Sequence, residues 1–275
     1  PGWGRRPTCD VGHSVAMTQI PDRAWRAGRF WWDSSRPSEA GPHPLRAVVF
    51  DLESLTDAEC GGSRLAFNAA FAAHGLPVTW SAARYRKLLA LRDERQRVAA
   101  ELRARGICTE CDVLLRVLVD QICATKSRML DEVMLGADLD ARSGLVELIT
   151  DGFTAGVAVG VVSTGRRQWV EPLVRQLVGD GLVQTVVTAD DLAPAAPLGA
   201  AFRMALAEMG APAHDSLAFT GSTDGLRDAM SVGLAGVLVD PEVIGARADY
   251  EGLRITDCQR LHAESWARGN RSAAA

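Results

Sequence analysis

The feature that most constrains the fold of this chain is an alternation of short β-branched runs with longer segments of helical periodicity. Parallel strands need this alternation, because each crossover between them is long enough to hold a helix. The runs predict strands at residues 47–50, 157–162, 184–187, 217–219 and 236–239. Apolar positions recur at helical spacing in residues 145–153, 169–178, 200–209 and 226–232. The pattern predicts a doubly wound α/β sheet.

One long interval has no predicted strand. Between residues 63 and 135 the pattern is helical throughout, with expected helices at 64–74, 82–91, 94–105 and 113–130. We therefore predict a Rossmann-like core of residues 45–62 and 136–257, with an all-helical cap of residues 63–135 inserted after the first strand. Residues 1–44 are expected to form an irregular N-terminal extension and residues 258–275 a frayed tail. Ligands of open α/β sheets bind at the carboxyl ends of the strands, so the cap is expected to face that end.

Composition excludes several classes of protein. The chain has 275 residues, 47% of them hydrophobic, and a formal net charge of −4, which predicts a soluble globular protein with no overall attraction to nucleic acid or anionic membranes. No run approaches the roughly 18 apolar residues that span a bilayer, and we expect a cytoplasmic protein. The six scattered cysteines are expected to be reduced. Cys108 and Cys111 lack two further zinc ligands at matching spacing, so they are interpreted as two thiols on a helix.

Carboxylates follow the first predicted strand directly. Residues 48–57 read VVFDLESLTD, so Asp51 and Glu53 stand at the carboxyl end of a buried run. A carboxylate in that place is costly unless it is paired, bound to metal or solvated in a cleft, which makes Asp51 the strongest candidate site residue. Ser163 and Thr164 follow the second strand and are suited to hydrogen-bond an anion. Helix capping is the alternative for both hydroxyls, and for Ser222 after the fourth strand.

The strand that leads into an acidic turn, followed by a helical insertion, resembles the haloacid-dehalogenase-like superfamily, most of whose members are magnesium-dependent phosphatases and phosphomutases. The resemblance implies that Asp51 is the nucleophile and forms an aspartyl phosphate, and that Glu53 is the acid and base. It implies that Ser163 and Thr164 hold the phosphoryl oxygens. Asp51 would also bind Mg²⁺, together with an aspartate of a later loop.

Within the predicted cap, residues 66–77 read AFNAAFAAHGLP. With Trp80 and residues 85–89, this stretch resembles the sugar-bisphosphate phosphatases encoded in Calvin-cycle operons, which are close to β-phosphoglucomutase-like enzymes. The resemblance implies a small phosphorylated metabolite as substrate. It also implies that Arg95, Arg97 and Lys126 are the basic residues of the cap that hold it, although a charge-rich helix more often presents such residues to solvent.

Two motifs of the family have lost their charge. Ala196 stands where the lysine of the third motif is expected, and no lysine follows Lys126. Gly221 stands at the metal-binding aspartate of the fourth motif, although Asp224 lies three residues later and could serve as a substitute ligand. Other charged residues near these loops are Arg166, Arg167, Asp190 and Asp191. Because Gly221 replaces one metal ligand of the family, Mg²⁺ is doubtful as a cofactor. Removing one preorganised charge at a reacting centre also costs about 10²–10³ in rate.

Two functions stay open at this point. The first is a phosphatase for small phosphorylated sugars with weak or lost activity. The second is an inactive pseudophosphatase that binds a phosphorylated metabolite or a protein partner and acts as a regulator.

Overall fold

A computed structural model describes residues 44–91, 93–107 and 111–274, with side chains up to residue 264. The predicted N-terminal extension of residues 1–44 lies outside the described residues except for Pro44, and so does Cys108 of the predicted thiol pair. Across the described part of the chain, no helix combines the length and apolar character needed to cross a membrane.

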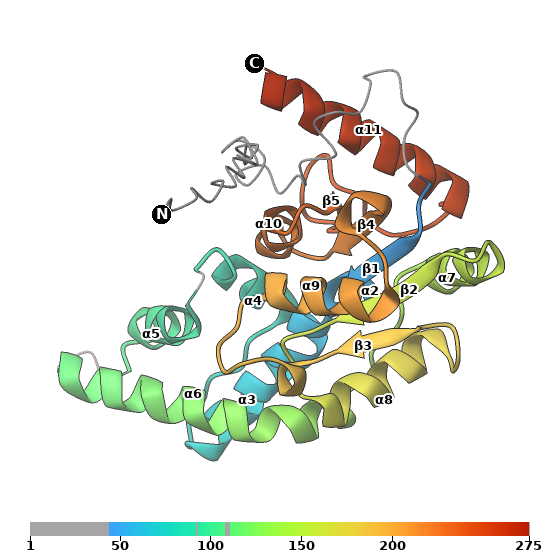
Figure 1. Ribbon diagram of the computed structural model, residues 1–275. Helices are drawn as coiled ribbons and strands as arrows, with labels where there is room; N and C mark the ends of the chain where they lie inside the picture. The colour runs from blue at the N-terminus through green and yellow to red at the C-terminus, as the bar shows by residue number, and fades with distance from the viewer. Residues whose placement is uncertain (1–43, 92, 108–110, 275) are drawn as a thin grey trace, which may run out of the picture. The chain divides into compact units, whose positions relative to one another are not determined.

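The core is a five-stranded parallel sheet with strand order β3-β2-β1-β4-β5 (Figure 1). The strands are β1 (Ala47–Asp51), β2 (Ala158–Val162), β3 (Thr185–Val187), β4 (Ser216–Thr220) and β5 (Ala235–Leu238). The central strand β1 pairs with β2 from Ala47↔Ala158 to Asp51↔Val162, and with β4 from Ala47↔Ser216. The predicted doubly wound α/β fold is confirmed, and the predicted strands agree with the observed ones to within one residue at either end.

Helices cover both faces of the sheet. They are α7 (Leu145–Thr154), α8 (Arg167–Val178), α9 (Leu198–Met209), α10 (Thr223–Ser231) and α11 (Ile255–Ala274). Successive residues of a strand point to opposite faces. Val48 and Phe50 of β1 therefore pack with α7, α8 and α11, whereas Ala47 and Val49 pack with α9 and α10. The strand is buried along its whole length, so its last residue is held in a rigid setting.

The chain end differs from its prediction. Residues from 258 onward were expected to form a frayed tail, but the structure has helix α11 from Ile255. Cys258 and His262, one helical turn apart, are 0% and 2% exposed, and the His262 ring Nε2 lies 2.8 Å from the His214 carbonyl. The polar His262 is buried by this contact with a distant carbonyl, which a hydrophobic pattern does not reveal.

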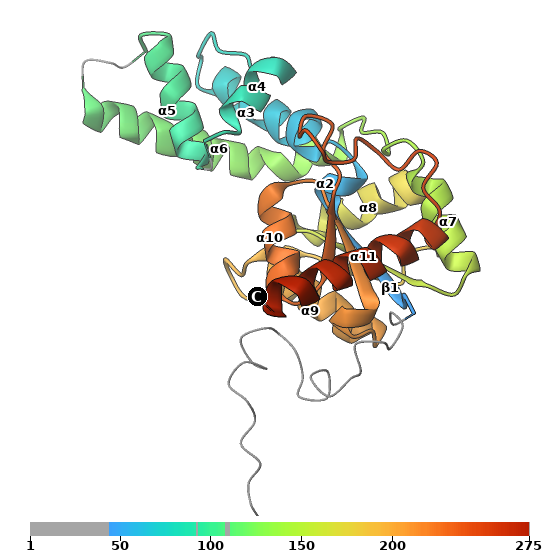
Figure 2. The ribbon, with the colours of Figure 1, turned by 90° about the horizontal axis from the view of Figure 1, so that it is seen from above.

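Every element between β1 and β2 is helical (Figure 2). After the short α2 (Leu52–Leu55) come η1 (a π-helix, Glu59–Ser63), α3 (Arg64–Ala73), α4 (Ala82–Leu88), α5 (Glu94–Ala104) and α6 (Asp112–Leu135) before α7. Helices α3 to α6 enclose a hydrophobic cluster of their own, with Phe67, Phe71, Trp80 and Tyr85 all 0% exposed. This separate cluster supports our proposal that residues 63–135 are a cap domain on the core.

Candidate functional site

Asp51 lies at the carboxyl end of β1 and caps helix α2. Its Oδ1 accepts hydrogen bonds from the backbone N–H of Ser54 at 2.8 Å and of Gly221 at 2.9 Å. The side chain is almost fully enclosed, with 3% of the residue exposed. Burial raises the pKa of Asp51 to about 6, although the two N–H donors and the charge of Arg142 oppose the rise. The carboxylate thus joins the loop after β1 to the loop after β4.

Gly221 approaches the β1 loop too closely for any side chain. An ideal Cβ at this position would lie 2.4 Å from the carbonyl carbon of Glu53 and 2.5 Å from its oxygen. A Cβ at Gly225 would lie 2.6 Å from Asp51 Oδ2. Neighbouring backbone cannot move aside as a flexible side chain can. An aspartate therefore does not fit at position 221 in this arrangement, and backbone encloses both oxygens of Asp51.

The proposed substitute metal ligand is engaged elsewhere. Asp224 lies in the first turn of α10 with 55% of its side chain exposed, and it forms an ion pair with Arg227. The other charged candidates also have partners: Arg166 with Asp131, Arg167 with Asp191 and Glu171, and Asp190 with the Arg167 N–H. Among the described residues, no group of three or more His, Cys, Asp or Glu side chains could hold a metal. The residues present do not fit a divalent metal held between Asp51 and the β4 loop.

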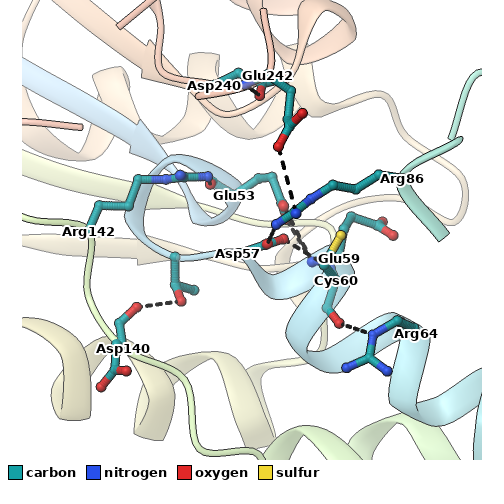
Figure 3. Close-up of polar contacts among 11 residues, drawn as sticks. Glu53, Asp57, Glu59, Cys60, Arg64, Arg86, Asp140, Arg142, Asp240 and Glu242 are labelled. Carbon is teal, nitrogen blue, oxygen red and sulfur yellow. Dashed lines mark hydrogen bonds and ion pairs between the residues drawn. The ribbon is translucent and has the colours of Figure 1, made fainter. Parts of the chain in front are cut away.

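Glu53 turns away from the sheet and toward the start of the cap (Figure 3). Both of its carboxylate oxygens lie within hydrogen-bond distance of the Glu59 N–H, at 3.3 and 3.2 Å. Burial is the largest cause that raises the pKa of Glu53 well above its usual value, and the negative charges of Glu59, Asp51 and Asp57 add to it. Glu53 therefore keeps its proton at a pH where an exposed glutamate has lost it, so it could donate a proton.

Two arginines contact the site residues, although no sequence motif predicted that they would. Arg142 Nη2 donates to the Glu53 carbonyl at 3.0 Å, from 89 residues away along the chain. Arg86 of α4 pairs with Asp57 at 2.9 Å and with Glu242, after β5, at 3.7 Å (Figure 3). Arg86 thereby connects the cap to both ends of the core sequence. No local spacing marks these residues, because only the folded chain brings them to the β1 loop.

The hydroxyl pair after β2 divides into one buried and one exposed residue. Ser163 is 5% exposed, and its Oγ accepts a hydrogen bond from the Gly165 N–H at 3.0 Å. Thr164 is exposed. Helix α8 begins after Arg166 and has no side-chain cap, so the capping alternative for Ser163 and Thr164 is wrong. Ser222 does cap α10, because its Oγ accepts from the Gly225 N–H.

The three basic residues proposed to bind substrate in the cap do not lie together. Arg97 and Lys126 are 9% and 6% exposed and lie inside the cap. Lys126 Nζ donates to Glu94 at 2.6 Å. Arg95 is 64% exposed and pairs with Asp120 at 2.7 Å, on a groove lined by neither Arg97 nor Lys126. A shared role in binding one substrate thus stays a prediction for Arg97 and Lys126, and the position of Arg95 does not support it.

Comparisons with known proteins agree with this architecture. "Protein CbbY, plasmid" of Cupriavidus necator is 29% identical over 218 residues, which cover 76% of this chain and 83% of that protein. "Protein CbbY" of Cereibacter sphaeroides is 27% identical over 211 residues, which cover 76% of this chain and 89% of that protein. The crystal structure of CbbY from Rhodobacter sphaeroides in complex with phosphate matches with a TM-score of 0.55 at 26% identity, over 76% of this chain and 97% of that chain.

A β-phosphoglucomutase-like protein of Thermotoga maritima shares the fold, with a TM-score of 0.52 at 17% identity over 74% of this chain and 89% of that chain. The predicted resemblance is therefore confirmed. A family model described as haloacid dehalogenase-like hydrolase matches residues 45–231. On this match, which covers more than half of its length, the chain belongs to the haloacid dehalogenase-like hydrolases.

Proposed function

We propose that this protein is a pseudophosphatase, which binds a small phosphorylated sugar and has lost magnesium-dependent phosphoryl transfer. Hydrolases of this family generally use Mg²⁺. The observation that carries the proposal is the packing of Gly221 against the Glu53 backbone, which leaves no room for a ligating side chain. In place of a metal, the Gly221 N–H meets Asp51.

The chemistry explains why this matters. A phosphoryl group repels an approaching carboxylate unless positive charge neutralises its oxygens. Here the lysine position of the third motif holds Ala196, and the metal position of the fourth holds Gly221. Loss of two such charges costs on the order of 10⁴ in rate, allowing for non-additivity. Asp51 is also engaged by two N–H donors, which lowers its reactivity further.

Other residues are the proposed contacts of a phosphorylated ligand. The exposed Thr164 at the end of β2 can donate to an anion, and Arg97 and Lys126 supply positive charge in the cap. The related CbbY structures contain phosphate in one case and xylulose 1,5-bisphosphate in another, the latter at 25% identity with a TM-score of 0.54, over 76% of this chain and 92% of that chain. These ligands support a phosphorylated sugar as the ligand class for this chain.

A slow phosphatase is the second candidate, because Glu53 keeps its proton close to Asp51. Asp51 would attack phosphorus and break the bond to the sugar oxygen, which would take its proton from Glu53. Water, activated by the Glu53 carboxylate, would then cleave the aspartyl phosphate and release inorganic phosphate.

Phosphate release from a panel of sugar mono- and bisphosphates, with and without millimolar magnesium, separates the two candidates. The same protein preparations are titrated with inorganic phosphate and xylulose 1,5-bisphosphate by calorimetry. Asp51→Asn removes the attacking group, and Asp180→Asn, at a side chain that is 81% exposed, is the matched control. We expect binding by the unaltered protein, with phosphate release that neither magnesium nor Asp51→Asn changes. Magnesium-stimulated release that Asp51→Asn abolishes would establish the phosphatase instead, and absence of binding would refute both candidates.

A further inference from the structure

A groove on the cap lies apart from the site described above. It runs between α5 and α6 with a volume of about 610 Å³. Its lining residues are Leu91, Arg95, Gln96, Ala99, Ala100, Arg103, Leu115, Arg116, Val119 and Asp120. None of Asp51, Glu53 or Ser163 borders it, so the groove is not part of the phosphatase-like site.

The floor of the groove is apolar. Ala99 on α5 and Val119 on α6 belong to the floor, and the small alanine lets a partner approach the α5 backbone closely. On the α6 side, Leu115 and Val119 are only 2% and 4% exposed, whereas Leu91, Ala99 and Ala100 are half-buried. The accessible apolar surface of the groove therefore lies on the α5 side.

The rim of the groove is basic, although the whole chain has a formal net charge of −4. Residues 63–135 hold twelve lysines and arginines against eight acidic residues. Arg95, Arg103 and Arg116 are the three arginines of the rim. Arg103 pairs with Asp112 at 3.8 Å, with side chains 58% and 78% exposed, and Arg116 has no ion pair with any described residue. Exposed pairs contribute about 0–1 kcal/mol, so a partner's carboxylates can replace them.

We propose that the groove between α5 and α6 is a docking site for an amphipathic, acidic helix of another protein. Arg95, Ala99 and Arg103 form one row at spacing i, i+4, i+8, which places the two arginines about 12 Å apart along α5. A helix in the groove meets them with acidic residues about two turns apart, while its apolar face covers the half-buried Leu91, Ala99 and Ala100. Residues 1–44 of this chain are the wrong occupant, because they hold six arginines and four acidic residues.

The test uses a synthetic helical peptide of about 18 residues, long enough to span the groove. One face carries leucine, and glutamates flank it at two-turn spacing. A second peptide has lysine at every glutamate position. Arg103→Glu/Arg116→Glu reverses the rim charge, and Arg175→Glu/Arg254→Glu is the control with the same change of net charge on exposed arginines of the core. Binding is measured by fluorescence anisotropy, and circular dichroism checks that each variant folds.

We expect the acidic peptide to bind the unaltered protein and the control variant equally. The rim variant is expected to bind it about tenfold more weakly or worse, and to prefer the lysine peptide. Equal binding of both peptides, or of the acidic peptide to both variants, overturns the proposal, as does absence of binding. Sedimentation of the protein alone tests the remaining occupant: a dimer that the rim variant dissociates would assign the groove to a second copy of this chain and refute the proposal.

Discussion

The charged groups of the core site and of the cap groove differ in their exposure to solvent. In the core, the Asp51 carboxylate is sealed by protein, with two backbone N–H donors on one oxygen and the Gly225 backbone beside the other. On the cap, the guanidinium groups of Arg95, Arg103 and Arg116 line an open groove. The carboxylate at the end of β1 is thus part of the buried structure, whereas Arg95 and Arg103 of the groove are 64% and 58% exposed.

The comparison teaches that the function proposed for Asp51 depends on the contacts of its side chain and not on its residue type alone. Asp51 is present, yet it accepts hydrogen bonds from two backbone N–H groups, and Gly221 packs directly against the Glu53 backbone. Substitutions in the sealed region should therefore alter stability strongly, while substitutions on the groove should leave it almost unchanged.

The largest effect is expected from a methyl group at position 221. Gly221→Ala places a Cβ about 2.4 Å from the Glu53 backbone, and overpacking of this kind costs about 3 kcal/mol. Gly136→Ala is the control, because a Cβ there would make ordinary contacts at 3.7 and 3.9 Å. Urea unfolding measures both free energies. Equal values for the two variants would show that the β4 loop is not packed on the β1 loop as described.

An effect of about the same size and of opposite sign is expected from Asp51→Asn. The pKa of Asp51 is raised from 3.8 to about 6 in the folded state, so the folded protein binds a proton that the unfolded chain releases. Stability contributed by the protonated form is complete below pH 4 and is lost as the pH rises through 6. Asparagine resembles the protonated form, so the variant should be more stable by about 3 kcal/mol at pH 7.5 and nearly equal to the unaltered protein at pH 4.

Urea unfolding across that pH range checks the Asp51→Asn prediction. Asp180→Asn, at a side chain that is 81% exposed, is the control and should show no such pH dependence. An Asp51→Asn variant that is less stable than the unaltered protein at pH 7.5 would contradict the prediction. It would mean that a further positive partner compensates the charge of Asp51.

The smallest effect is expected from the groove. Arg103→Ala removes one exposed ion pair, 3.8 Å long, and should change the free energy of unfolding by less than about 0.5 kcal/mol. Thermal unfolding of Arg103→Ala and Gly221→Ala under the same conditions compares the two losses of stability. A loss comparable to that of Gly221→Ala would mean that the rim arginine is structural, and the distinction between the sealed core and the open groove would fail.

The sequence by itself determined the strands, most of the helices and the family. Apolar residues that recur with period 2 or 3.6 mark the buried face of a strand or a helix, so these elements can be predicted from the sequence. It also determined that Asp51 and Glu53 stand at the end of β1 and that the charges expected at positions 196 and 221 are gone. It missed helix α11, where the polar His262 is buried through a contact with the His214 carbonyl that no hydrophobic pattern shows.

Only the tertiary structure decided what those residues contact. Asp51 and the Gly221 N–H are 170 positions apart, and Arg142 reaches the Glu53 carbonyl across 89. Such contacts depend on which segments the topology brings together at the carboxyl ends of the strands, and no local sequence pattern encodes this. The same is true of Arg95, which shares a helix with Arg97 yet faces solvent while Arg97 is buried. Spacing along a helix fixes relative direction, but the packing of that helix on its neighbours decides which direction is inside.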